Sequence, residues 1–141
     1  MQSYFADALV NAPDIDAFIF DSFSNPTIEE IRERLFPFIE KLQGAHPGKP
    51  LIFQHTIYRE RRNFDLATEK NESERMRVVD ELMAEAVKRY KDVYYVTTTN
   101  ATSPKHDTSV DGTHPGDHGY SLWAESIQKP ILKILRKYGI R

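Results

Sequence analysis

The sequence predicts an α/β fold in which helices cover both faces of a parallel sheet. Three short apolar runs have the character of strands, each run is followed by a segment with helical spacing, and turn residues separate the units. Strands that alternate with helices form parallel sheets, because right-handed crossovers return the chain to the same end of the sheet. At 141 residues the chain fits a single domain, residues 1–141.

The predicted strands are compact apolar runs. They are "IDAFIFD" (15–21), "LIFQH" (51–55) and "DVYYVT" (92–97). Runs of this length and composition are typical of strands that are buried on both faces of a parallel sheet.

Segments with apolar residues three or four positions apart connect the strands and close the chain. The predicted helices span about residues 4–10, 28–42, 66–90 and 116–138. Thr27 and Glu30 form a T-x-x-E capping box at the start of the second helix. Pro37 is expected to kink or split that helix, and Pro130 interrupts the last one.

The composition restricts the classes of function. A net charge of −2 gives no electrostatic reason to expect nucleic acid or an anionic membrane as a partner. No apolar run reaches the roughly 18 residues that a membrane span requires. The absence of cysteine excludes a disulfide framework and thiol chemistry. We therefore expect a soluble globular domain.

Three unusual loops are expected at one edge of the sheet. In open parallel sheets, ligands bind beyond the carboxyl ends of the strands. The segments that leave those ends are "DSFSNPT", "HTIYRERR" and residues 97–116. We therefore look for a functional site where these three segments meet.

Asp111 and His114 lie three positions apart, immediately before the last predicted helix. On a turn this offset lets the carboxylate hold one ring nitrogen and leave the other free as a general base. The alternative is that Asp111 caps a turn and His114 is a polar loop residue. The spacing alone does not separate these two interpretations.

The other two loops carry further candidates, each with an alternative. Asn25 could donate its amide to a developing oxyanion, or it could cap a helix with Pro26 at the first helical position. His55, Tyr58 and Arg59 could form a substrate-binding lip with an anion-pairing arginine. They could equally belong to a solvated surface loop.

A metal site is a further alternative. Histidines and aspartates are concentrated before the last helix, and His114 and His118 have an i,i+4 spacing that suits one ion. The candidate ligands are His106, Asp107, Asp111, His114, Asp117 and His118. Gly112, Pro115 and Gly116 break the segment, and no third fixed ligand can be named. We therefore expect no metal ion.

Taken together, the motifs resemble the SGNH (GDSL-type) serine hydrolases, a flavodoxin-like esterase family. The similarity covers the carboxyl-terminal two-thirds of that fold, from "IDAFIFDSFSNPT" through "PFIEKLQGAHPGKPLIFQHTIY" to "VDGTHPGDHGYSLWAESIQKPILKIL". Its most specific motif is "DGTHP" before a closing amphipathic helix, which corresponds to the family's acid–base block. The resemblance implies a flavodoxin-like three-layer sandwich, most similar to a bacterial branch of the family.

The resemblance also implies a role for each matched residue. His114 corresponds to the general base, Asp111 to the residue that orients it, and Asn25 to the side-chain oxyanion donor. The implied reaction is acyl transfer through a covalent seryl ester, without a metal or cofactor. The implied substrates are acyl or acetyl esters of small molecules or carbohydrates.

Two defining blocks of the family have no counterpart in this sequence. The G-D-S serine and a glycine oxyanion donor are absent, so we expect the fold to lack its first two strands. Ser22 and Ser24 are alternative nucleophiles, but their stretch aligns with the asparagine block. Two hypotheses follow: the chain is the acid–base part of a serine esterase and is inactive alone, or it is a non-catalytic binding or structural module.

The missing strands also predict an association. In the family's sheet order the first strand pairs beside "DAFIFD". Without it, this segment becomes an apolar sheet edge with unpaired backbone groups, which favours association. We expect a homo-oligomer that covers the edge, or else an amino-terminal helix that folds across it.

Overall fold

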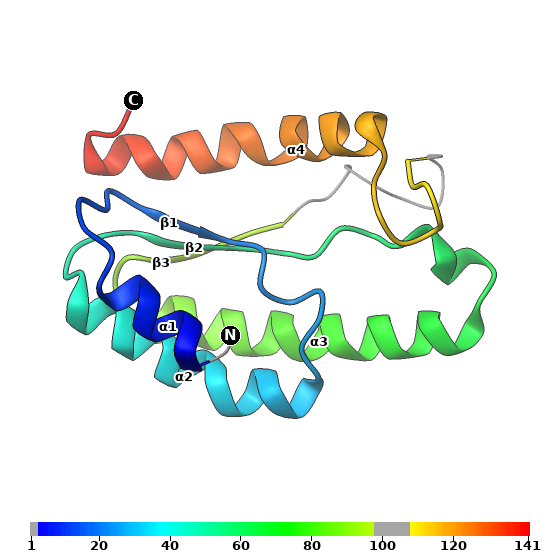
Figure 1. Ribbon diagram of the computed structural model, residues 1–141, viewed down its shortest axis with the longest axis horizontal. Coiled ribbons are helices and arrows are strands. Elements are labelled where there is room, and N and C mark those ends of the chain that lie inside the picture. Colours follow the sequence, from blue (N-terminus) through cyan, green and yellow to red (C-terminus); the bar gives the residue numbers. More distant parts are fainter. Residues whose placement is uncertain (1–2, 98–107) are drawn as a thin grey trace.

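The computed structural model describes residues 3–97 and 108–141, and these ranges confirm the predicted α/β fold (Figure 1). The elements are α1 (Ser3–Val10), β1 (Phe18–Phe20), α2 (Ile28–Ala45), β2 (Leu51–Gln54), η1 (Glu60–Asn63), α3 (Leu66–Arg89), β3 (Val93–Val96), α4 (Asp117–Leu135) and η2 (Arg136–Tyr138). The strands run parallel in the order β1-β2-β3. In Figure 1, α1, α2 and α3 lie on one face of the sheet and α4 lies on the other. The molecule therefore has three layers.

The larger core lies between the sheet and the layer that contains α2 and α3. Phe53 of β2 is fully buried, and its ring contacts Phe20, Phe23 and Phe38, with centroids 5.0, 5.9 and 6.4 Å away. Fully buried aliphatic residues of α2 and α3 complete this core; they are Ile31, Leu35, Ile39, Leu42, Val79 and Met83. Burial of this apolar surface anchors the sheet on its helical layer.

A smaller core lies between the sheet and α4. It joins Ile52 of β2 and Val96 of β3 to Ile131 and Ile134 of α4. Ile19 of β1 is in register with Ile52 and so points to the same face, yet it is 47% exposed. The expectation that residues 15–21 form a strand buried on both faces is therefore wrong, because α4 packs over β2 and β3 and leaves this face of β1 open.

The ends and interruptions of the helices follow from identifiable residues. The predicted capping box is present: Glu30 N donates to Thr27 Oγ1 at 3.2 Å, and Thr27 N donates to Glu30 Oε2 at 3.0 Å. Pro37 does not split α2, which continues from Ile28 to Ala45. Pro37 is exposed, so the carbonyl that its missing N–H leaves unpaired can be hydrated.

The amino-terminal helix does not cover the free edge of β1. It packs against α2, where Lys41 pairs with Asp7 and His46 Nε2 lies 2.9 Å from the carbonyl oxygen of Leu9. Within residues 3–97 and 108–141, β1 pairs with β2 alone. Over the same ranges, no helix is long and apolar enough to cross a membrane.

Substitution of Gly119 tests how α4 is seated. A Cβ at Gly119 would lie 2.2 Å from the carbonyl oxygen of Thr108, so Gly119→Ala must push α4 from the preceding loop. We expect it to lower the free energy of unfolding by about 1–3 kcal/mol. Gly44→Ala is the matched control, because no atom lies within 4 Å of its Cβ position in α2. Urea denaturation compares the two variants, and wild-type stability of Gly119→Ala would contradict this packing.

Candidate active site

The segment before α4 forms a closed loop, residues 108–116. Ser109 and Pro115 form an antiparallel bridge, Val110 N donates to the carbonyl of His114 at 2.9 Å, and Gly116 N donates to that of Thr108 at 2.9 Å. The first residue of α4, Asp117, follows directly. The backbone is thus fixed on both sides of Asp111 and His114.

Asp111 and His114 are paired within this loop. Asp111 Oδ2 lies 2.7 Å from His114 Nδ1, and Oδ1 accepts hydrogen bonds from the backbone N–H groups of His114 and Thr113 at 2.8 and 2.9 Å. The N–H and ring of His114, with the N–H of Thr113, hold the pKa of Asp111 well below its ordinary value. The His114 side chain is 77% exposed. The ring is therefore oriented through Nδ1, and no described residue binds its Nε2.

The turn η1 contacts this loop directly. Glu60 is buried, and its carboxylate accepts hydrogen bonds from the backbone N–H and hydroxyl groups of Thr108 and Ser109. Burial alone would raise the pKa of Glu60, but these hydrogen bonds outweigh it and lower the pKa. Arg61 N also donates to the carbonyl of Gly112 at 2.8 Å.

Asn25 follows β1 in an exposed loop whose backbone is held from the neighbouring elements. The carbonyl of Ser24 accepts from Arg59 Nη2 at 2.8 Å and from Arg75 Nη1 at 2.6 Å. Thr27 caps α2, which excludes the alternative that Asn25 is the cap. Among the described residues, no hydrogen bond involves the Asn25 side chain. Its amide is thus available at the same edge of the sheet.

The three candidates of the second loop bind other residues of the chain. Arg59 donates to Glu72 Oε1 at 2.8 Å as well as to Ser24. Tyr58 donates its hydroxyl to Asn63 at 2.7 Å. His55 Nδ1 lies 2.6 Å from the carbonyl oxygen of Thr56, and the ring packs near Tyr95. These contacts give the three side chains roles within the protein; whether they also contact a substrate stays a prediction.

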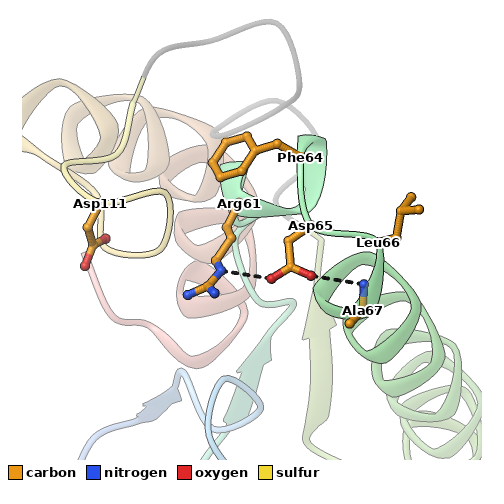
Figure 2. Close-up of a pocket in the computed structure, with 6 residues that line it drawn as sticks. All are labelled: Arg61, Phe64, Asp65, Leu66, Ala67 and Asp111. Carbon is orange, nitrogen blue, oxygen red and sulfur yellow. Dashed lines mark hydrogen bonds and ion pairs between the residues drawn. The ribbon is translucent and has the colours of Figure 1, made fainter.

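A cavity of about 670 Å³ lies beside Asp111 (Figure 2). Its lining residues are Arg61, Phe64, Asp65, Leu66, Ala67 and Asp111. Phe64 and Leu66 are 76% and 87% exposed, so they present apolar surface to the solvent there. Neither residue was predicted as part of a site, although two apolar residues that follow a charged run are a usable signal.

The described residues bear on two alternatives, a metal site before α4 and a nucleophilic serine after β1. His106 and Asp107 lie outside the described residues. Across residues 3–97 and 108–141, no three histidine, aspartate or glutamate side chains converge on one point. Ser24 Oγ donates to Asp21 Oδ1 at 3.2 Å, and no described serine hydroxyl contacts His114.

Comparisons with known proteins agree with this geometry. Residues 1–133 match the model of the GDSL-like Lipase/Acylhydrolase family. A crystal structure from Bacteroides ovatus, described as a GDSL-like lipase, is similar with a TM-score of 0.85 and 31% identity, over 96% of this chain and 40% of that one. A salicylyl-acyltransferase from a tetracycline biosynthetic pathway shares the fold, with a TM-score of 0.66 and 18% identity, over 94% of this chain and 41% of that one.

The chain thus spans about 40% of the length of these solved structures. No curated protein gives a significant match to the sequence. The similarity supports the family resemblance inferred from "DGTHP", and the fold of the matched region agrees with it.

The contact between Asp111 and His114 predicts the tautomer of the neutral imidazole. Since a carboxylate only accepts, the ring proton should reside on Nδ1. In Asp111→Asn, the side-chain amide can donate to Nδ1 and should move the proton to Nε2. Long-range proton–nitrogen correlation NMR, recorded above the ordinary titration range of imidazole, distinguishes the two forms. His118 is an internal control, and an unchanged His114 pattern in Asp111→Asn would contradict the pairing.

Proposed function

The chain belongs to the GDSL-like lipase/acylhydrolase family, and from this premise we propose that it supplies the acid–base part of an ester-hydrolysing active site. The observation that carries the proposal is the 2.7 Å contact between Asp111 Oδ2 and His114 Nδ1, which orients the ring and leaves Nε2 accessible. An oriented imidazole beside a carboxylate is the acid–base arrangement of acyl transfer through a serine.

Each residue has a defined step in the proposed reaction. His114 Nε2 takes the proton of a serine hydroxyl as its oxygen attacks the ester carbonyl, and Asp111 stabilises the resulting imidazolium. The Asn25 amide donates to the oxyanion of the tetrahedral intermediate. His114 then protonates the departing alkoxide, and a water molecule, deprotonated by His114, releases the acid and regenerates the serine.

The nucleophile is proposed to come from a G-D-S block that this sequence does not contain. It would lie on another segment of the same polypeptide or on a separate chain. Ser22 and Ser24 are the competing candidates within this sequence. A fluorophosphonate reaction followed by peptide mapping shows whether either of them is a reactive nucleophile. We expect no adduct on this chain by itself.

The cavity beside Asp111 supports an acyl group as part of the substrate. Phe64 and Leu66 present apolar surface there, and Arg61 contributes a guanidinium that also donates to Asp65 Oδ2 at 3.2 Å. Such a surface suits the hydrocarbon part of an acyl ester, while an alcohol or sugar would extend into water. We therefore propose acyl or acetyl esters, including carbohydrate esters, as the substrate class.

A second candidate function is a non-catalytic binding module. The observation that favours it is that, in the part of the chain described, no serine hydroxyl reaches His114, although the cavity is present. The two candidates differ in whether His114 does chemistry once a nucleophile is supplied.

A chimaera tests the proposed function. This chain replaces the matching 40% of the Bacteroides ovatus protein, which retains its remaining sequence. We expect hydrolysis of p-nitrophenyl acetate and octanoate by the chimaera, and a loss of at least about 10³-fold in kcat/KM for His114→Ala. Asn25→Ala should lower kcat by about 10²–10³-fold, as the loss of one oxyanion donor does.

The matched control in the chimaera is His118→Ala. His118 is an exposed histidine four positions along the same segment and has no role in the proposed reaction, so activity should be retained. A folded chimaera that fails to hydrolyse esters that the parent hydrolyses would refute the catalytic proposal in favour of the binding module. Equal losses in His114→Ala and His118→Ala would refute the assigned base.

We also propose that the free edge of β1 is covered by a second copy of the chain. Ile19 of this edge strand is exposed on the sheet face that α4 leaves open, and the backbone groups on the outer side of β1 have no strand partner among the described residues. Light scattering at tens of micromolar should show a homodimer, and Ile19→Glu should shift it toward monomer. Val87→Glu on α3 is the control, because Val87 is similarly exposed at 43%. A monomeric wild type with cooperative unfolding would contradict this association.

A further inference from the structure

We propose that Arg59 and Glu60 are positioning residues that set the two halves of the site relative to each other. Glu60 holds the 108–116 loop, which carries Asp111 and His114, and Arg59 holds the loop that carries Asn25. This role rests on the proposed function, in which one loop carries the general base and the other carries the oxyanion donor. The contacts themselves are all formed between residues of this chain.

Glu60 is matched to its site by charge and by geometry. Its Oε1 accepts from Thr108 N at 2.5 Å and Thr108 Oγ1 at 2.6 Å, and its Oε2 accepts from Ser109 N at 3.1 Å and from the Ser109 hydroxyl. A carboxylate is an acceptor at both oxygens, so it satisfies all of these donors at once. A buried charge is tolerated only when it is bonded in this way. A neutral amide of the same size would instead place N–H donors against N–H donors.

The adjoining residue fixes the same loop nearer to its tip. Arg61 N donates to the carbonyl of Gly112, one residue beyond Asp111. Gly112 has φ of +79°, and a Cβ there would lie 3.2 Å from Arg61 Cβ. Contacts from η1 therefore reach the loop at its start and at its tip, on both sides of Asp111.

Arg59 has the corresponding role toward the loop after β1. Its guanidinium spans two partners, donating from Nη1 to Glu72 Oε1 and from Nη2 to the carbonyl of Ser24, both at 2.8 Å. Arg75 donates to the same carbonyl at 2.6 Å and pairs with Glu72 at 3.2 Å. Asn25 is the next residue, so the plane of its preceding peptide group is fixed by these cations.

The two residues that hold these loops, Arg59 and Glu60, are consecutive in sequence. Glu60 and Arg59 are joined by a single peptide bond, so the loop of His114 and the loop of Asn25 are both hydrogen-bonded to one short segment of the chain. A base and an oxyanion donor must keep their relative placement within a fraction of an ångström for catalysis. This requirement gives the pair a role beyond the general stability of the fold.

The experiment on Glu60 uses the isolated chain. In Glu60→Gln, hydrogen exchange of the Ser109, Val110 and His114 amides should accelerate at least about tenfold relative to wild type. The His114 imidazole should keep its Nδ1–H form, because Asp111 holds the ring within the turn itself and not through Glu60. Glu81→Gln is the control, since Glu81 forms an exposed pair with Arg77 on α3. Thr108→Val removes one donor at constant size and should produce a smaller change of the same kind, which keeps the test available if Glu60→Gln does not fold.

The experiment on Arg59 uses the conservative variant Arg59→Lys, which retains the charge but cannot span Glu72 and Ser24 together. We expect shifted side-chain and backbone amide signals of Asn25, with the exchange of the 108–116 loop unchanged. Arg77→Lys is the exposed control. A drop in global stability without these local changes, in either variant, would overturn the proposal by assigning Arg59 and Glu60 a merely structural role.

The hydrogen-exchange and NMR measurements on these variants do not require catalytic activity. If the two variants show the expected local changes but the chimaera is inactive, the proposed function alone is refuted. If the chimaera is active but Glu60→Gln and Arg59→Lys leave the two loops unchanged, the positioning role alone is refuted.

Discussion

The parallel direction of β1, β2 and β3 is the constraint on which the candidate site depends, because it brings the loops that follow the strands to one edge of the sheet. Such loops expose backbone donors and acceptors that no strand pairs, and each needs a partner. Two adjacent side chains supply these partners: Arg59, which directly precedes η1, and Glu60, its first residue. Glu60 accepts from residues 48 and 49 positions later, and Arg59 donates to a carbonyl 35 positions earlier. The site is therefore assembled by long-range contacts that converge on one short turn.

Most of the fold could be predicted from the sequence because its determinants are local. The capping box of Thr27 and Glu30 lies within one helical turn, and the alternation of apolar runs with helical spacing sets the parallel topology. The burial of β1 could not be predicted in the same way. An apolar run shows that a strand packs on something, but which strands α4 covers depends on how Ile131 and Ile134 pack onto Ile52 and Val96.

The same distinction applies to the site. The contact between Asp111 and His114 was predictable because three positions on a turn allow it, and the resemblance of "DGTHP" to the family's acid–base block selected it over a simple turn cap. Glu60 was not, since in "RERR" it resembles one charge of a solvated run, and its burial depends on the distant arrival of Thr108 and Ser109. Arg59 was selected as a substrate-binding candidate for its charge alone. Its partners, Glu72 and the carbonyl of Ser24, lie too far along the sequence for any pattern to indicate them.

Orientation and placement of the imidazole therefore have different physical origins. Hydrogen bonds within one turn orient the ring and keep Asp111 ionised, and they need no burial, since both side chains are exposed. Placement of that turn against the loop of Asn25 needs a buried carboxylate and two arginines, whose hydrogen bonds are strong because they are charge-assisted and partly removed from water. A D-x-x-H spacing can occur on many surfaces. Under the proposed function, the pair also needs a fixed position relative to the Asn25 amide, and the contacts from Arg59 and η1 are proposed to set that position.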